Sequence, residues 1–262
     1  MRTVNGRSQL LGLALASLVS FGPGCGVQQR AAEKLIDPQL RSEGVLVERQ
    51  RGRRDLELGR YRVEELELVD ETFDGSGPLA PDADGRTRPT EQLRMSFTLA
   101  GGAQPWTAEC VGQRRQPPDH DLAVLAGELR DEVAVHCQLA GGESRWVLRV
   151  EGPLTNNLLG RVYAAGEAEP GELGEVGELG QLGEGGPGRV VEVVMWYQLW
   201  NFTRRHLPAS LVVIRGDEGT EAALILDAPE RAWLDAALDD SGRELALTTM
   251  LALRLLPLGF DG

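Results

Sequence analysis

Residues 241–257 read Ser-Gly-Arg-Glu-Leu-Ala-Leu-Thr-Thr-Met-Leu-Ala-Leu-Arg-Leu-Leu-Pro, and this stretch decides the architecture that we expect. Ser241 and Glu244 have the spacing of a capping box, which begins a helix, and Pro257 would end it. A surface helix is apolar along one stripe, whereas this one is apolar almost all round. We therefore expect a C-terminal helix that is buried inside the rest of the domain. The side chains expected in the core include Leu247, Met250 and Leu251.

The chain before this helix alternates apolar and polar residues, with the period of a strand that has one buried face. Parity changes at Gly59-Arg60 and Glu64-Glu65 predict short turns or bulges. We predict a mainly β fold of about ten antiparallel strands, arranged as a barrel or a sandwich, with one buried C-terminal helix. The alternating segments are residues 45–68, 93–99, 106–110, 133–139, 146–150, 158–164, 190–200, 211–214, 222–226 and 232–234.

The segment 190–200 differs from the others because it is almost continuously apolar, which is typical of a strand buried on both faces. Its aromatic residues, Trp196, Tyr197 and Trp200, either line a ligand pocket or belong to the core. We favour the core, since aromatic and β-branched neighbours are common in strands.

The N-terminus has the order of a secretory signal. Arg2 and Arg7 precede an apolar run, and small residues follow it. The run of about twelve residues is shorter than the roughly twenty that span a membrane. We predict a signal peptide over residues 1–24 and an exported protein.

The end of this segment resembles the signal of a bacterial lipoprotein, in which a cysteine that follows the cleaved bond carries acyl chains. Gly24-Cys25-Gly26 supplies the cysteine with a small residue on each side, although Gly22 stands where the family usually has Leu. The resemblance implies lipidation at Cys25, attachment to a membrane surface, and sorting to the outer membrane. The alternative is ordinary cleavage after Ala16 or Ser20, with Cys25 a free thiol.

The remaining organisation follows from composition. We expect a lipidated tether over residues 25–42 and a single β-rich domain over residues 43–262. Within that domain, residues 166–188 are rich in Gly and Glu, and we expect them to form a disordered acidic loop. The alternative is an acidic arm that binds cations or a basic partner.

Cys110 and Cys137 remain as a pair once Cys25 is assigned to the lipid. In an oxidising compartment, two cysteines in alternating strand segments predict a disulfide rather than a metal site. The alternative is two buried free thiols.

The charge of the chain excludes one class of partner. Removal of residues 1–24 takes away Arg2 and Arg7 and no acid, so 27 basic side chains become 25 against 40 acidic ones, a net charge of −15. Such a field repels nucleic acid, and we expect no nucleic-acid partner.

Motifs that carry chemistry are weak. Asp82, Asp84 and Glu91 partly match a calcium loop, but its first position is Ala80. The sequence has no Ser nucleophile elbow, zinc-protease motif or phosphate loop. We predict no catalytic residue, no cofactor and no metal site. The histidines that we considered as a base or ligand, and interpreted as surface residues, are His120 and His136.

The pattern of signal, cysteine pair and apolar terminal helix resembles uncharacterised lipoproteins of G+C-rich Gram-negative bacteria. Strands that end in such a helix are also similar to the tubby-type barrel, where the sheet wraps the final helix. Three functions remain open at this point. They are a non-catalytic envelope module that binds a protein or has a structural role, a binder of lipid or another hydrophobic ligand, and a hydrolase with an unrecognised site.

Overall fold

The computed structural model describes residues 32–49, 56–72, 90–115, 132–153, 157–166, 188–200, 203–226 and 230–256. For residues 71–72, 195–200 and 203–210 it describes the backbone alone. The predicted signal peptide, Cys25, His120, nearly all of the predicted acidic loop and most of the partial calcium motif lie outside these residues. Those predictions stay predictions.

Twelve antiparallel strands form one sheet, so the prediction of a mainly β fold is confirmed. The strands are β1 (Val45–Glu48), β2 (Glu57–Leu58), β3 (Tyr61–Thr72), β4 (Thr90–Ala100), β5 (Trp106–Arg115), β6 (Glu132–Gly141), β7 (Ser144–Pro153), β8 (Leu158–Ala164), β9 (Arg189–Trp200), β10 (Thr203–Gly216), β11 (Gly219–Ile225) and β12 (Arg231–Leu234). The expected number of about ten is too low, because residues 45–68 hold three strands. A change of parity alone does not distinguish a bulge within one strand from a turn between two strands.

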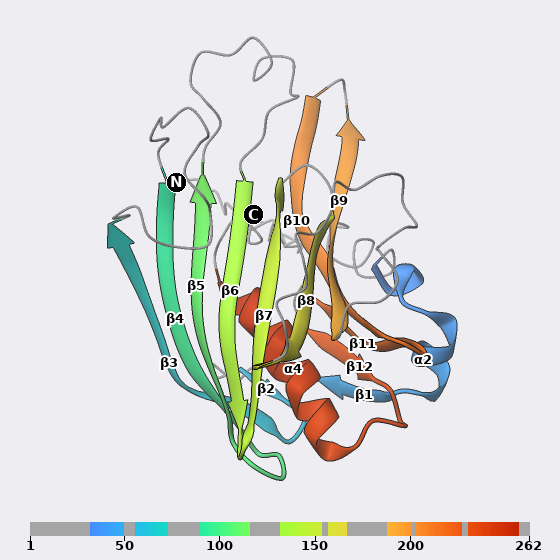
Figure 1. The fold of residues 1–262 in the computed structure, drawn as a ribbon. Helices are drawn as coiled ribbons and strands as arrows, with labels where there is room; N and C mark the ends of the chain where they lie inside the picture. The colour runs from blue at the N-terminus through green and yellow to red at the C-terminus, as the bar shows by residue number, and fades with distance from the viewer. Residues whose placement is uncertain are drawn as a thin grey trace, which may run out of the picture.

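The sheet is a nearly closed barrel (Figure 1). Strands β2 to β12 are paired in sequence order, each with the next, and β1 pairs with β12. Arg49, which follows β1, forms a bridge with Leu58 of β2, and Gly59 N–H donates to the Glu48 carbonyl at 3.1 Å. These contacts join the two ends of the sheet, so a two-layer sandwich is not the arrangement.

Helix α4 (Asp240–Leu255) crosses the lower part of the barrel in Figure 1, where it contacts β5 and β6 on one side and β10, β11 and β12 on the other. Every residue from 244 to 253 is buried, which confirms the predicted buried helix. Leu247, Met250 and Leu251 belong to the main core with inward side chains of the strands. The expected cap is wrong: Asp239 is the N-cap, and its side chain accepts a hydrogen bond from Gly242 N–H at 2.7 Å. A carboxylate serves this position as well as a hydroxyl does.

The predicted alternation places the expected side chains inside. Met95, Phe97 and Leu99 of β4 are buried, and Cys110 of β5 lies in the same core as Cys137 of β6. Gly59 and Arg60 form the turn between β2 and β3, and the register of β3 shifts between Glu64 and Glu67. Both parity changes therefore mark the turn and the bulge that they predict.

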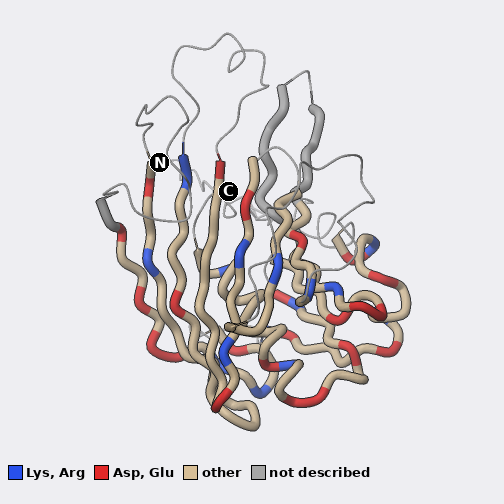
Figure 2. Tube along the Cα trace, viewed as in Figure 1, with Lys and Arg blue, Asp and Glu red and all other residues tan. Residues whose placement is uncertain are grey.

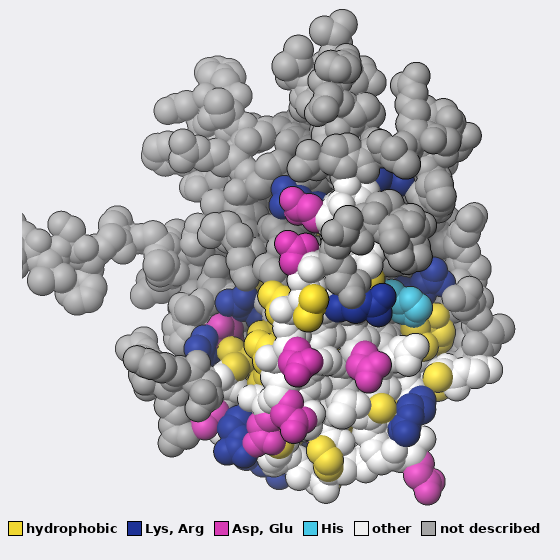
Figure 3. Space-filling view, turned by 90° about the vertical axis from the view of Figure 1, so that its left-hand side faces the viewer, with side chains coloured by type: hydrophobic (Ala, Val, Ile, Leu, Met, Phe, Trp, Pro, Cys, Tyr) yellow, Lys and Arg dark blue, Asp and Glu magenta, His cyan; other side chains and the backbone are white. Residues whose placement is uncertain are grey.

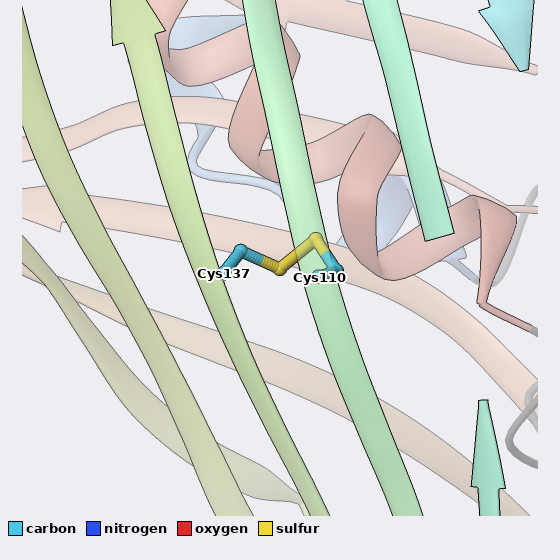
Figure 4. The surroundings of a disulfide bond; sticks show 2 residues. All are labelled: Cys110 and Cys137. Atoms are coloured by element: carbon cyan, nitrogen blue, oxygen red, sulfur yellow. A yellow bond between two sulfur atoms is a disulfide. The ribbon is translucent and has the colours of Figure 1, made fainter. Parts of the chain in front are cut away.

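Figure 4 shows the disulfide between Cys110 and Cys137, which joins two directly paired residues of β5 and β6. Their Cα atoms are 4.0 Å apart. The predicted bridge is confirmed.

A second core lies outside the barrel. Residues 32–35 are helical, and α2 (Pro38–Glu43) follows after Asp37, whose side chain caps it. The side chains of this outer core are Ala32, Ile36, Leu40, Leu211, Val213, Ala223, Ile225 and Trp233. This packing buries both faces of residues 211–214, the property that we expected of residues 190–200, where Val191 and Val193 are buried and Val190 and Val194 only half-buried. The described part of the expected tether, residues 32–42, is thus packed on the sheet.

Candidate functional site

The register of four neighbouring strands brings two rows of side chains together on the outside of the barrel. Directly opposed residues in an antiparallel sheet point to the same face. The first row consists of Val69, Arg94, Val111 and His136. The second row consists of Glu67, Ser96, Glu109 and Gln138. We call this surface of strands β3 to β6 the β3–β6 face.

The β3–β6 face is hollowed into a groove of about 390 Å³, which both rows line together with parts of Met95 and Cys110. Figure 3 views the molecule from the side on which β3 lies, and hydrophobic, acidic and basic side chains are interspersed there. The groove is open to solvent along β3, where the side chains are exposed, whereas His136 is half-buried.

Charges of both signs stand in neighbouring rows. Arg94 and His136 belong to the first row, and Glu67 and Glu109 belong to the second. The first row continues to Arg149 on β7, which lies 3.7 Å from Glu151. A surface of this composition suits an elongated polar partner that carries charges or hydrogen-bonding groups along its length.

The spacing of these groups does not suit nucleophilic catalysis. Ser96 and His136 are separated by β5, so their strands lie about 10 Å apart across the sheet. A serine nucleophile needs its base within hydrogen-bond distance. Glu67 and Glu109 are likewise separated by β4. The described side chains of the groove therefore support binding more than reaction.

The strand at the rim of the groove has an open edge. One edge of β3 pairs with β4 from Arg62 to Thr72, except at the bulge of residues 65–66, while Tyr61 and Arg62 alone pair with β2 on the other edge. Val63 N–H also donates to the Leu56 carbonyl, at 3.0 Å. Beyond Val63, no described strand pairs with this second edge. Such an edge presents backbone groups to another extended chain.

Side chains beside the open edge are unusually apolar for an exposed strand. Leu66, Leu68 and Val69 are 49%, 47% and 51% exposed. Leu68 is paired with the inward-facing Met95, and Val69 is paired with the outward-facing Arg94. Exposed apolar side chains therefore flank the edge on both faces of β3.

A larger groove, of about 750 Å³, lies between α2 and the β10–β11 turn, and its rim is acidic. Three of its carboxylates have local structural roles. Asp37 accepts from Gln39 N–H at 2.7 Å, Asp235 accepts from Ala237 N–H at 2.8 Å, and Glu221 forms an ion pair with Arg189. Within the described parts of the chain, no three His, Cys, Asp or Glu side chains lie close enough to hold a metal ion.

Only some of the residues considered from sequence can be placed. His136 lies in the β3–β6 groove, whereas the side chains of Trp196, Tyr197 and Trp200 lie outside the described ones. Sequence reasoning missed the groove, because its rows combine residues from four strands. The sequence did contain one signal, the alternation of polar and apolar residues in each strand. This alternation predicts which residues face outward, but not which outward residues of different strands lie next to each other.

No family model, curated protein or solved structure matches this chain. Among the described residues, no helix has the length and apolar character that crossing a membrane requires.

Proposed function

We propose that this protein is a lipoprotein of the cell envelope, attached through acyl chains on Cys25, that acts as a non-catalytic module for binding another protein. The signal-like N-terminus and Gly26 after the cysteine support attachment to the outer membrane. The cysteine pair, which forms a disulfide, suits an exported protein.

One observation carries the binding part of the proposal. Residues 244–253 of α4 are buried on all sides, so the protein's own helix occupies the lower part of the barrel. A small barrel that binds a hydrophobic ligand usually keeps that space for the ligand. Recognition then falls to the outer surface, where the β3–β6 groove adjoins the open edge of β3. A helix inside the sheet also supports a proposed likeness to tubby-type barrels.

The other two functions have less support. A hydrophobic-ligand binder needs an apolar cavity, and the described core is filled with side chains of α4 and the strands. A hydrolase needs a clustered catalytic set, and β5 separates Ser96 from His136.

Attachment is tested with the full chain expressed with its own signal. We expect the protein to partition into the detergent phase and the Cys25→Ser variant to remain in the aqueous phase. If both forms partition into water, the lipoprotein proposal is wrong.

Binding is tested by photo-crosslinking in the cells that naturally make the protein. A photoreactive residue in place of Val69, at the rim of the groove, should give discrete adducts with an envelope protein. The same residue in place of Asp217, on the β10–β11 turn, serves as the control and should not. The outcome that contradicts a non-catalytic module is turnover of ester or glycoside substrates that His136→Ala or Glu109→Gln abolishes.

A further inference from the structure

The open edge of β3 has a definite usable length. The register shift between Glu64 and Glu67, with Glu65 at φ 53°, interrupts the regular ladder of the strand. Thr98 Oγ1 donates to Glu65 Oε2 at 3.1 Å, which holds the bulge against β4. Residues 67–72 then follow in unbroken register. An added strand can pair regularly with this stretch of about six residues.

Apolar side chains make this edge different from the rest of the described surface. In the part of the chain that the structure describes, six large hydrophobic side chains are exposed, and half of these are Leu66, Leu68 and Val69 of β3. Single exposed apolar residues are ordinary, but a cluster beside unpaired backbone marks an interaction site.

Charge selects the partner. Between Glu64 and Glu71, β3 carries five acidic side chains, and its single base, Arg62, is ion-paired with Glu64. Figure 2 shows the acidic residues of β3 before Glu71 as a series of red segments along the strand. A second copy that paired edge to edge would bring acids against acids, which destabilises a sheet. The complementary strand is therefore basic and belongs to another protein.

The order of residues on β3 predicts which residue types a complementary added strand should carry. Reading from Glu67 to Glu71, the strand presents an acid, two apolar residues and two further acids. Since directly opposed side chains share a face, the matching positions of an added strand are basic, apolar, apolar, basic and basic. Backbone hydrogen bonds would supply affinity, and these side chains would supply selectivity.

We propose that residues 67–72 of β3 bind an extended segment of a partner protein, as an added strand in which two adjacent apolar residues are flanked by Lys or Arg. This inference names the partner segment of the binding function proposed above, and it rests on that function.

The test measures binding of a labelled, capped peptide to the full mature chain in detergent, by fluorescence anisotropy at low salt. The probes are Thr-Lys-Arg-Val-Leu-Lys, for antiparallel pairing, and its reverse, for parallel pairing. We expect one of them to bind in a saturable way. The matched control is the same peptide with alternate backbone nitrogens methylated, which keeps charge and apolar side chains but removes donors on one edge. Its affinity for the protein should be lower than that of the unmethylated peptide by about tenfold or more.

Two protein variants separate this site from general attraction to an acidic protein. Glu67→Lys with Asp70→Lys should weaken peptide binding by about tenfold or more, because opposed charges become like charges. Asp217→Lys with Glu218→Lys makes the same change in net charge on the β10–β11 turn and should alter binding less than about threefold. Circular dichroism checks that both variants are folded.

Equal weakening by the two variants, or equal binding of the methylated peptide, would overturn the inference. So would self-association of the chain that Glu67→Lys with Asp70→Lys abolishes, because the edge would then bind a second copy. If crosslinking at Val69 gives adducts while both peptides fail, the proposed function stands and only this inference falls.

Discussion

The Glu244 carboxylate shows how one side chain can position an element. It is 1% exposed, and it accepts hydrogen bonds from Trp106 Nε1 at 3.0 Å and from the backbone N–H of Ala103. Trp106 in turn lies over Gly141, where an added Cβ would come within 2.2 Å of the indole ring. The N-terminal half of α4 is thereby tied to β5 and to the loop before it.

Trp106→Phe should lower the free energy of unfolding by about 1–3 kcal/mol, because a buried carboxylate loses its indole donor. Urea denaturation measures the change. Trp146→Phe is the matched control, since that ring is half-buried and stacks near Arg189, with 5.4 Å from the guanidinium carbon to the ring centroid. A double-mutant cycle with Glu244→Ala should give a coupling energy above about 0.5 kcal/mol. Additive effects would mean that Trp106 matters only for its volume.

The disulfide acts on the unfolded chain. Cys110 and Cys137 are 27 residues apart and both are buried, so the bridge closes a loop of that length from within the core. Replacing both cysteines with Ala should cost about 3–4 kcal/mol, the loop-closure entropy for this separation. Chemical denaturation of the wild-type protein and of the double Ala variant measures this difference in stability. Unchanged stability would show that the rest of the fold already restricts the loop.

At the scale of elements, α4 belongs to the core and not to a surface. Leu251 is 1% exposed and lies in the main core, whereas Leu46 of β1 is 47% exposed. Leu251→Ala should cost about 2–5 kcal/mol, because it leaves a cavity in a packed interior. Leu46→Ala, the same chemical change, should cost less than about 1 kcal/mol. Thermal unfolding of both variants gives the comparison.

Truncation of the chain after Asp240 extends this prediction to the whole helix. Because α4 contributes buried side chains all round, we expect the truncated protein to lose its cooperative melting transition. If it kept that transition and lost only membrane or partner binding, α4 would be an interaction element instead.

At the scale of the whole molecule, a buried carboxylate lies where the two ends of the sheet close the barrel. Glu230, which precedes β12 and is 1% exposed, accepts two hydrogen bonds from Arg49, at 3.0 and 3.1 Å. Arg254, near the end of α4, lies 3.4 Å from the same carboxylate. This cluster joins the chain after β1, the start of β12 and the helix, at the place where the two ends of the sheet meet.

Glu230→Ala should therefore cost about 2–4 kcal/mol, because it leaves two partly buried cations without this partner. Faster amide exchange in β1 and β2 would locate the effect at the closure. Glu64→Ala removes an exposed ion pair with Arg62 and should cost less than about 1 kcal/mol. Equal effects of the two changes would show that the Glu230 cluster adds nothing to closure.

Local periodicity was sufficient to predict most of the strands, many of their inward residues and the buried helix. Residues 93–99 alternate, and residues 244–253 are apolar all round. Each pattern shows which faces of its own segment are buried, and it can be recognised from consecutive residues alone. The pairing of Cys110 with Cys137 was also predictable, because only these two cysteines remain once Cys25 is assigned to the lipid. The bulge near Glu65 was visible as a change of parity.

The tertiary structure alone decided the features that depend on distant parts of the chain. Glu244 has the spacing of a capping residue, yet its partners are Trp106 and Ala103, which lie about 140 positions earlier in the chain. The β3–β6 groove exists because strand register aligns eight outward side chains, and a slip of one residue would face them inward. Among the described strands none pairs with the outer edge of β3 beyond Val63, because β2 ends after two residues. Register and sheet closure are set by contacts between distant segments, which the period of a single segment does not encode.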